Sequence, residues 1–106
     1  MYIGPQCNIG KCAIGKNTLL GSGVHIMSGK GQHNFSDPEK PIKDQGGVFT
    51  KVIIGENCWL GNGALIMANV GKGSIVAAGS VVVDDVPAGV VVGGNPAKVL
   101  RALDSK

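Results

Sequence analysis

The chain has 106 residues, a formal net charge of +3, 16% charged residues, 4% aromatic residues and 18 glycines. The low charge excludes intrinsic disorder, and the many glycines argue against a helix bundle, because glycine is a poor helix former. The basic residues are too few and too scattered to predict a nucleic-acid surface. Three cysteines are too few for a disulfide scaffold, and we interpret them as small buried thiols.

A repeat of six residues organises residues 1–28. An aliphatic residue followed by glycine recurs at this spacing, with one step of five, in the pairs Ile3-Gly4, Ile9-Gly10, Ile14-Gly15 and Leu20-Gly21. We interpret the aliphatic position as pointing inward, where it stacks on its copies in neighbouring coils. We attribute the glycine that follows to a turn of the chain with a positive φ angle.

Residues 29–51 contain no such repeat. Both phenylalanines of the chain, Phe35 and Phe49, lie in this stretch. Two aromatic rings favour an ordered loop, and a long excursion from a compact repeat is usually functional. We therefore expect a functional loop between two groups of coils.

The repeat resumes over residues 52–92. Its fifth position holds small or branched residues such as Cys58, Ser74 and Ser80, which indicates a crowded corner. A β-sandwich is the alternative, but it predicts a period of two rather than glycine at intervals of six. The pattern instead favours a solenoid of short strands, in which each coil buries its aliphatic residues against the next.

The repeat ends at residue 92. Residues 93–96, GGNP, predict a turn, and residues 97–103, AKVLRAL, predict a short helix that caps the open end of the coils. We therefore expect one all-β domain over residues 1–106. It comprises first coils (1–28), an excursion loop (29–51), later coils (52–92) and a C-terminal turn and cap helix (93–106).

Three motifs make the chain resemble the hexapeptide-repeat acyltransferases. They are GQHNF (31–35) followed by DPEKPI (37–42), then IGENCWLG (54–61), and VGGNPAKV (92–99). The loop motif is most similar to that of sugar and polysaccharide O-acetyltransferases. The resemblance implies a left-handed parallel β-helix, a homotrimer, and acetyl-CoA in the groove between two prisms. It also implies that a sugar or similar hydroxylated small molecule enters beside the loop as the acceptor.

His33, in the excursion loop, is the candidate general base. A hydroxyl is a poor nucleophile, so a base must remove its proton as it attacks a thioester. An imidazole, with an ordinary pKa of about 6.5, suits this role at neutral pH. The resemblance matches His33 to the family's catalytic histidine, and the alternative is a solvated loop histidine. The second histidine, His25, falls at an outward position of the repeat, where a surface or subunit-contact role is expected.

Trp59 and Asn62 are candidate site residues beside the repeat. Trp59 is the single tryptophan and falls at an outward position, which suits either an interface anchor or a platform for a ligand. The resemblance implies that Trp59 lies against the thioester end of the cofactor. It also implies that the backbone N–H of Asn62 faces the oxyanion that develops during acyl transfer.

Further cofactor contacts are expected after residue 76. The small residues Ala78 and Gly79 would form a flat wall for a pantetheine arm, with ordinary corner packing as the alternative. Lys98 and Arg101 would share one face of the cap helix, where the resemblance implies contacts with cofactor phosphates; a solvated helix end is the alternative. Relatives often carry lysine where this chain has Asp84, and an acid near a phosphate weakens cofactor binding.

Three functions compete. The first is an acyl-CoA-dependent O-acetyltransferase. The second is a zinc hydro-lyase of the gamma carbonic anhydrase type, which requires three histidine ligands; the chain has two histidines, so we expect no metal. The third is a non-catalytic trimeric assembly or scaffold module. We recognise no signal peptide and no long apolar run, so we expect a cytoplasmic protein with no membrane span and no nucleic-acid partner.

Overall fold

The computed structural model describes residues 2–10, 12–27 and 51–103. Within these ranges the chain is all-β and forms no helix. The strands, in chain order, are β1 (Tyr2–Ile3), β2 (Asn8–Ile9), β3 (Cys12–Ile14), β4 (Leu19–Leu20), β5 (His25–Ile26), β6 (Val52–Ile54), β7 (Trp59–Leu60), β8 (Leu65–Ile66), β9 (Ile75–Val76), β10 (Val81–Val82), β11 (Val90–Gly94) and β12 (Ala97–Ala102). The loop motifs at 31–35 and 37–42, and His33 with them, lie outside the described residues.

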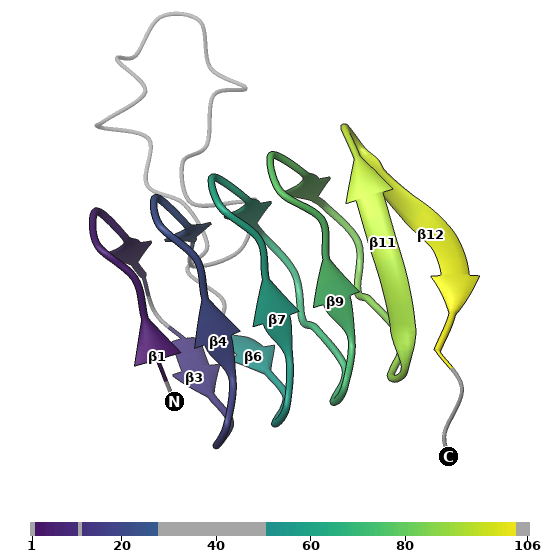
Figure 1. The fold of residues 1–106 in the computed structure, drawn as a ribbon, viewed down its shortest axis with the longest axis horizontal. Helices are drawn as coiled ribbons and strands as arrows, with labels where there is room; N and C mark the ends of the chain where they lie inside the picture. Colours follow the sequence, from purple (N-terminus) through teal and green to yellow (C-terminus); the bar gives the residue numbers. More distant parts are fainter. Residues whose placement is uncertain (1, 11, 28–50, 104–106) are drawn as a thin grey trace, which may run out of the picture.

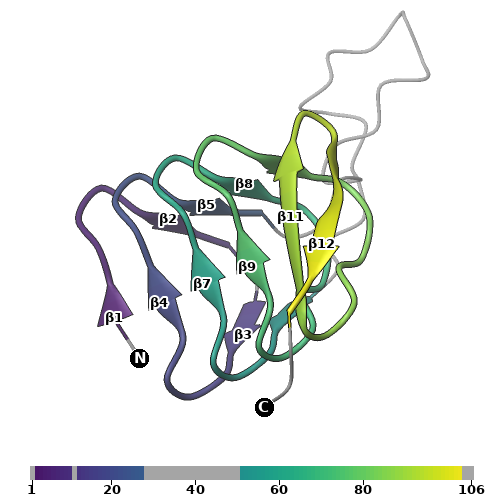
Figure 2. The ribbon, with the colours of Figure 1, turned by 45° about the vertical axis from the view of Figure 1, so that its right-hand side comes forward.

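The strands are arranged in three sheets, and the chain visits these sheets in turn. The first sheet has the order β1-β4-β7-β9-β11-β12, the second β10-β8-β5-β2, and the third pairs β3 with β6. Isolated bridges from Ile54 to Val70 and from Val70 to Val86 extend the third sheet. All of these pairings are parallel except that of β11 with β12. The chain is therefore a stack of three-sided coils (Figures 1 and 2).

The core is built from most of the inward aliphatic positions predicted by the repeat. The prediction was wrong for Ile3 and Ile9, which are 43% and 42% exposed, since among the described residues each pairs with a coil on one side alone. In the first sheet Leu20 pairs with Leu60, Leu60 with Val76 and Val76 with Val92, and all four side chains are at most 3% exposed. The other two sheets form equivalent buried columns, Ile26-Ile66-Val82 and Ile54-Val70-Val86. Burial of these columns removes apolar surface from water, which is the main force that holds the coils together.

The fifth positions of the repeat form hydrogen-bonded corners. The Thr18 hydroxyl donates to the Gly55 carbonyl at 2.8 Å and accepts from the Cys58 N–H at 3.2 Å. The Cys58 thiol donates to the Gly71 carbonyl at 3.2 Å, and the Ser74 hydroxyl donates to the Pro87 carbonyl at 2.6 Å. Small polar side chains thus satisfy backbone groups of the next coil, which would be costly to bury unpaired.

The glycine after each aliphatic position has a different cause from the one we expected. Positive φ angles occur two residues further on, for example 71° at Gly63, and not at Gly61. A Cβ atom at Gly61 would instead lie 2.5 Å from the backbone nitrogen of Ala78 in the next coil. Glycine is needed at Gly61 because the backbones of neighbouring coils approach too closely for any side chain.

The C-terminal segment corrects the prediction of a cap helix. The turn predicted over residues 93–96 is confined to Asn95 and Pro96, because Gly93 and Gly94 belong to β11. Ala97–Ala102 is the strand β12, which pairs antiparallel with β11. A bulge interrupts the pairing, since Val91 pairs with Arg101 whereas Val92 pairs with Val99. The physical reason is the free edge of β11, whose N–H and C=O groups need partners that a helix could not supply. Figure 2 shows the hairpin covering the end of the stack.

No described segment forms a helix of the length and apolarity that crossing a bilayer requires.

Of the three thiols predicted to be buried, Cys58 is buried, whereas Cys7 and Cys12 are half-buried. Burial raises the pKa of the Cys58 thiol, and it also raises that of Cys12, against a smaller opposing effect of the Lys51 charge. A raised pKa lowers the fraction of reactive thiolate at Cys58 and Cys12 near neutral pH.

Candidate active site

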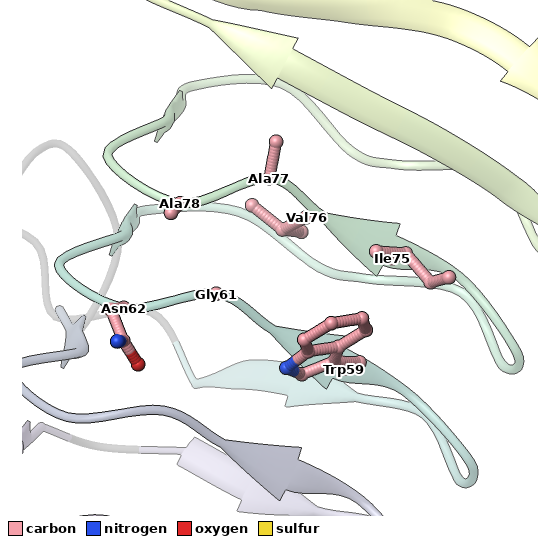
Figure 3. Close-up of a pocket in the computed structure, with 7 residues that line it drawn as sticks. All are labelled: Trp59, Gly61, Asn62, Ile75, Val76, Ala77 and Ala78. Atoms are coloured by element: carbon pink, nitrogen blue, oxygen red, sulfur yellow. The ribbon is translucent and has the colours of Figure 1, made fainter.

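A pocket lies on the outer face of the first sheet. It is formed by the strands β7 and β9 and by the turns that follow them. Its volume is about 260 Å³. The residues that line it are Trp59, Gly61, Asn62, Ile75, Val76, Ala77 and Ala78 (Figure 3). Three predicted site residues, Trp59, Asn62 and Ala78, are therefore brought to one surface.

Trp59 forms one wall of the pocket. It lies on β7, where the inward neighbour Leu60 is fully buried and Trp59 itself is 53% exposed. The predicted outward orientation of this side chain is thus confirmed. Trp59 pairs with Leu19 in the preceding coil and with Ile75 in the following coil, so the indole lies in an outward apolar column. An exposed ring of this size offers a flat apolar surface to a ligand or a second protein.

Asn62 occupies the tight turn that follows β7. The Ala64 N–H donates to the Gly61 carbonyl at 3.2 Å, and Gly63 has a φ angle of 71°, as in a type II turn. The side-chain Oδ1 of Asn62 accepts a hydrogen bond from the Ser22 N–H at 2.9 Å. No described residue accepts a hydrogen bond from the Asn62 N–H. A backbone donor is therefore left over at the edge of the pocket.

The next coil repeats this turn at Ala77–Ser80 with smaller side chains. The Ser80 N–H donates to the Ala77 carbonyl at 3.2 Å, and Gly79 has a φ angle of 71°. Ala77 and Ala78 line the pocket, whereas Gly79 does not. The Gly79 N–H instead donates to the Asn62 carbonyl at 2.9 Å and joins the two turns. Because the side chains of Ala77 and Ala78 are single methyl groups, an extended ligand can lie close to the backbone here.

Lys98 and Arg101 lie outside the pocket, on β12. Both side chains are exposed; Lys98 pairs with Gly93, and Arg101 pairs with Val91. Lys98 and Arg101 do not share a helix face as predicted, because the segment is a strand. They remain two exposed cations on the hairpin that covers the end of the stack.

The other predicted positions have separate locations. His33 lies outside the described residues, so its role as the base stays a prediction. His25 is exposed on β5, as its repeat position predicted. Ile75 is a pocket residue that was not predicted. The spacing of the repeat could have identified it, because Ile75 occupies the same outward position as Trp59 one coil later.

The pocket has no titratable side chain, since its seven lining residues are apolar, glycine or asparagine. Its own contribution to chemistry is therefore an apolar wall and backbone donors, and an acid or base must come from elsewhere. Among the described residues no group of three or more His, Cys, Asp or Glu side chains could hold a metal ion.

No protein-family model matches the chain. Among curated proteins, it is 56% identical over 59 residues to a 2,3,4,5-tetrahydropyridine-2,6-dicarboxylate N-acetyltransferase of Clostridium perfringens, a match that covers 54% of this chain and 25% of that protein. It is 38% identical over 95 residues to serine acetyltransferase 2 of Arabidopsis thaliana, covering 88% of this chain and 27% of that protein. The chain thus spans about a quarter of the length of these relatives.

Solved structures show the same fold. An N-acyltransferase from Bacillus cereus, in complex with dTDP-4-amino-4,6-dideoxyglucose and coenzyme A, matches with a TM-score of 0.82 and 19% identity over 98% of this chain and 61% of that chain. A maltose O-acetyltransferase from Clostridium difficile matches with a TM-score of 0.74 and 21% identity, covering 98% and 71%.

A hexapeptide-repeat containing acetyltransferase from Vibrio cholerae matches with a TM-score of 0.69 and 23% identity over 98% of this chain and 74% of that chain. The homologues and the structural neighbours are thus acetyltransferases and acyltransferases with this repeat. The six-residue period, the three-sided coil and these relatives make the chain similar to the hexapeptide-repeat acyltransferases over the part of them that it spans.

Proposed function

We propose that this chain is the catalytic β-helix of an acyl-CoA-dependent O-acetyltransferase, which moves an acetyl group from acetyl-CoA to a hydroxyl of a sugar or similar small molecule. The observation that carries the proposal is the pocket, in which Trp59 and Ala78 meet the Asn62 N–H, which no described residue engages, on one uncharged surface. The coils are proposed to be left-handed, as in the family that the repeat resembles.

Acetyl-CoA is the proposed acyl donor. The Bacillus cereus N-acyltransferase with the same fold binds coenzyme A. In our proposal the pantetheine arm runs along Ala78 and Gly79, and the thioester end lies against Trp59. The low wall of methyl groups and the exposed indole suit a long, flexible ligand with little charge. Lys98 and Arg101, both exposed on β12, are proposed to attract the phosphates at the other end.

The proposed reaction is a direct transfer. His33 removes the proton from the acceptor hydroxyl while the oxygen attacks the thioester carbonyl carbon. The negative charge that develops on the carbonyl oxygen is stabilised by the Asn62 N–H. Collapse of the tetrahedral intermediate breaks the C–S bond, and the coenzyme A thiolate takes the proton from the His33 imidazolium. The products are an acetyl ester and coenzyme A.

A hydroxylated small molecule is the proposed acceptor. The structural neighbours include an enzyme of maltose and one in complex with a nucleotide-linked amino sugar. The curated relatives include an N-acetyltransferase of a tetrahydropyridine dicarboxylate and an acetyltransferase of serine. These names define three acceptor classes to compare: a sugar hydroxyl, an amino-acid hydroxyl and an amine.

A homotrimer is the proposed assembly, with the pocket completed by a neighbouring copy. Two observations support it. The pocket contains no titratable group of its own, and large apolar side chains are exposed on the same sheet face, namely Tyr2 at 58% and Leu19 at 49%. Burial of this face between copies would remove apolar surface from water.

We also propose that the protein acts in the cytoplasm.

The test is an assay of thiol release from acetyl-CoA with maltose, serine and an amine as separate acceptors. We expect turnover with the sugar to exceed turnover with the other two. No turnover with any acceptor, combined with no measurable binding of coenzyme A, would overturn the enzymatic proposal and favour a scaffold. Preferential turnover of the amine would retain the transferase and overturn the O-acetyl assignment.

A further inference from the structure

The Asn62 side chain points away from the pocket that its backbone lines. Figure 3 shows the carboxamide directed away from Ala77 and Ala78 and toward the preceding coil. There its Oδ1 atom accepts a hydrogen bond from the Ser22 N–H at 2.9 Å. The side chain therefore joins two coils and makes no use of the open space beside it.

Gly21 creates the room for this contact. A Cβ atom at Gly21 would collide with the Oδ1 atom of Asn62 and would lie 2.9 Å from the Asn62 backbone nitrogen. Both the side chain and the backbone nitrogen of Asn62 thus rest against one glycine of the coil below. A movement of the carboxamide changes the packing under the nitrogen itself.

Two further hydrogen bonds hold this turn, one to the preceding coil and one to the following coil. The Gly63 N–H donates to the Ser22 carbonyl at 2.9 Å, and the Asn62 carbonyl accepts from the Gly79 N–H at 2.9 Å. The Asn62 N–H is the donor of this turn that no described residue engages. The turn is therefore held at three points around one unpaired N–H.

We propose that the carboxamide of Asn62 is a positioning group for the acyl-transfer step, and that its hydrogen bond to Ser22 keeps the Asn62 N–H aimed at the developing oxyanion. This inference rests on the proposed function. A misaligned donor loses part of its stabilisation of the transition state, while the ground-state cofactor contacts along Trp59 and Ala78 are unchanged. The effect should therefore fall on kcat and not on KM.

The chain contains a matched control at another corner. The Oδ1 atom of Asn69 accepts a hydrogen bond from the Ile53 N–H at 2.8 Å. This bond also links two coils through an asparagine side chain, but Asn69 does not line the pocket. Asn69→Ala therefore removes an equivalent structural bond with no positioning role.

The experiment compares wild type, Asn62→Ala, Asn62→Asp and Asn69→Ala in the acetyl-CoA assay with maltose, together with thermal unfolding. We expect Asn62→Ala to lower kcat about tenfold, a fraction of the loss when a whole oxyanion donor is removed, with the KM for acetyl-CoA within about twofold. Asn62→Asp keeps an acceptor for the Ser22 N–H and should restore kcat to within about threefold of wild type. Asn69→Ala should lower Tm as much as Asn62→Ala and leave kcat within about twofold.

The outcomes separate this inference from the function on which it rests. An active wild type whose kcat is unchanged in Asn62→Ala overturns the positioning role alone, as does an equal loss of kcat in Asn69→Ala. A loss that appears only in KM also overturns it. A wild type without turnover on any acceptor overturns the proposed function and the positioning role together.

Discussion

The hydroxyl of Thr18 accepts a hydrogen bond from the N–H of Cys58 at 3.2 Å, across the boundary between two coils. The same hydroxyl donates to the Gly55 carbonyl at 2.8 Å, and the Thr18 side chain is fully buried. One side chain therefore satisfies a donor and an acceptor of the neighbouring coil. The corner is one of several polar contacts between coils, with those of Ser74 and Ser80, beside the apolar columns of the stack.

Replacement of this hydroxyl should destabilise the fold. Thr18→Val has nearly the same shape but leaves the Gly55 carbonyl and the Cys58 N–H without their partner, and we expect a loss of about 2–3 kcal/mol in the free energy of unfolding. Urea denaturation at a fixed protein concentration measures this change. Thr18→Ser retains the hydroxyl and should lose about 1 kcal/mol or less. Equal losses in both variants would show that packing, and not hydrogen bonding, determines this corner.

The Cys58 thiol should react slowly. Burial raises the pKa of Cys58, so at pH 8 a smaller fraction is thiolate than in an exposed cysteine, and the thiolate is the reactive form. In a variant with Cys7→Ser and Cys12→Ser, we expect labelling at pH 8 by a water-soluble disulfide reagent at least about tenfold slower than that of a cysteine peptide. The same variant in denaturant is the control and should react at once. Rapid labelling of the folded protein would contradict the burial of this side chain.

His33→Ala tests the proposed base. General base catalysis contributes about 10²–10⁴-fold, so we expect kcat to fall at least about 10²-fold while the KM for acetyl-CoA changes little. The assay is thiol release with the best acceptor. His25→Ala is the control because His25 is exposed on β5 and lies apart from the pocket residues; it should retain kcat within about threefold. Unchanged turnover in His33→Ala would remove this histidine from the mechanism.

Arg101→Ala tests the proposed phosphate contact. Loss of one cation should raise the KM for acetyl-CoA several-fold and leave kcat nearly unchanged, since the phosphates are remote from the reacting thioester. Higher salt should shrink the difference from wild type, because the contact is exposed and screened. Lys72→Ala removes an exposed cation from a different turn and serves as the control. A fall in kcat with unchanged KM would refute the phosphate role.

The periodicity of the sequence predicted the core except at Ile3 and Ile9, which are exposed. Leu20, Leu60 and Val76 are buried and in register, because a strictly local rule, one inward residue per wall, determines their environment. The outward direction of Trp59 follows from the same rule. Prediction of the pocket requires the register between successive coils. Ile75 can be recognised as a neighbour of Trp59 only when the number of residues per coil is known.

The C-terminal segment shows where local reasoning fails. Residues such as Ala97, Lys98 and Leu100 have good helix propensity, and the sequence contains no mark of the free edge beside them. The edge of β11 is created by the whole stack, and pairing it stabilises a strand more than propensity stabilises a short helix. The reason for the glycine after each aliphatic position was mispredicted in a similar way. Glycine is needed at Gly61 because the backbone of Ala78 in another coil lies too close for a side chain, and not because of its own turn.

The antiparallel partner of β11 also decides how far the stack can extend. Coils that repeat one geometry have no intrinsic last member, and a bare parallel edge would accept the first coil of another molecule and start a fibre. β12 runs in the opposite direction and carries a bulge, so its outer edge presents the wrong polarity and spacing for a further coil. The hairpin thus gives the first sheet a C-terminal edge that is poorly matched to the addition of a further parallel coil.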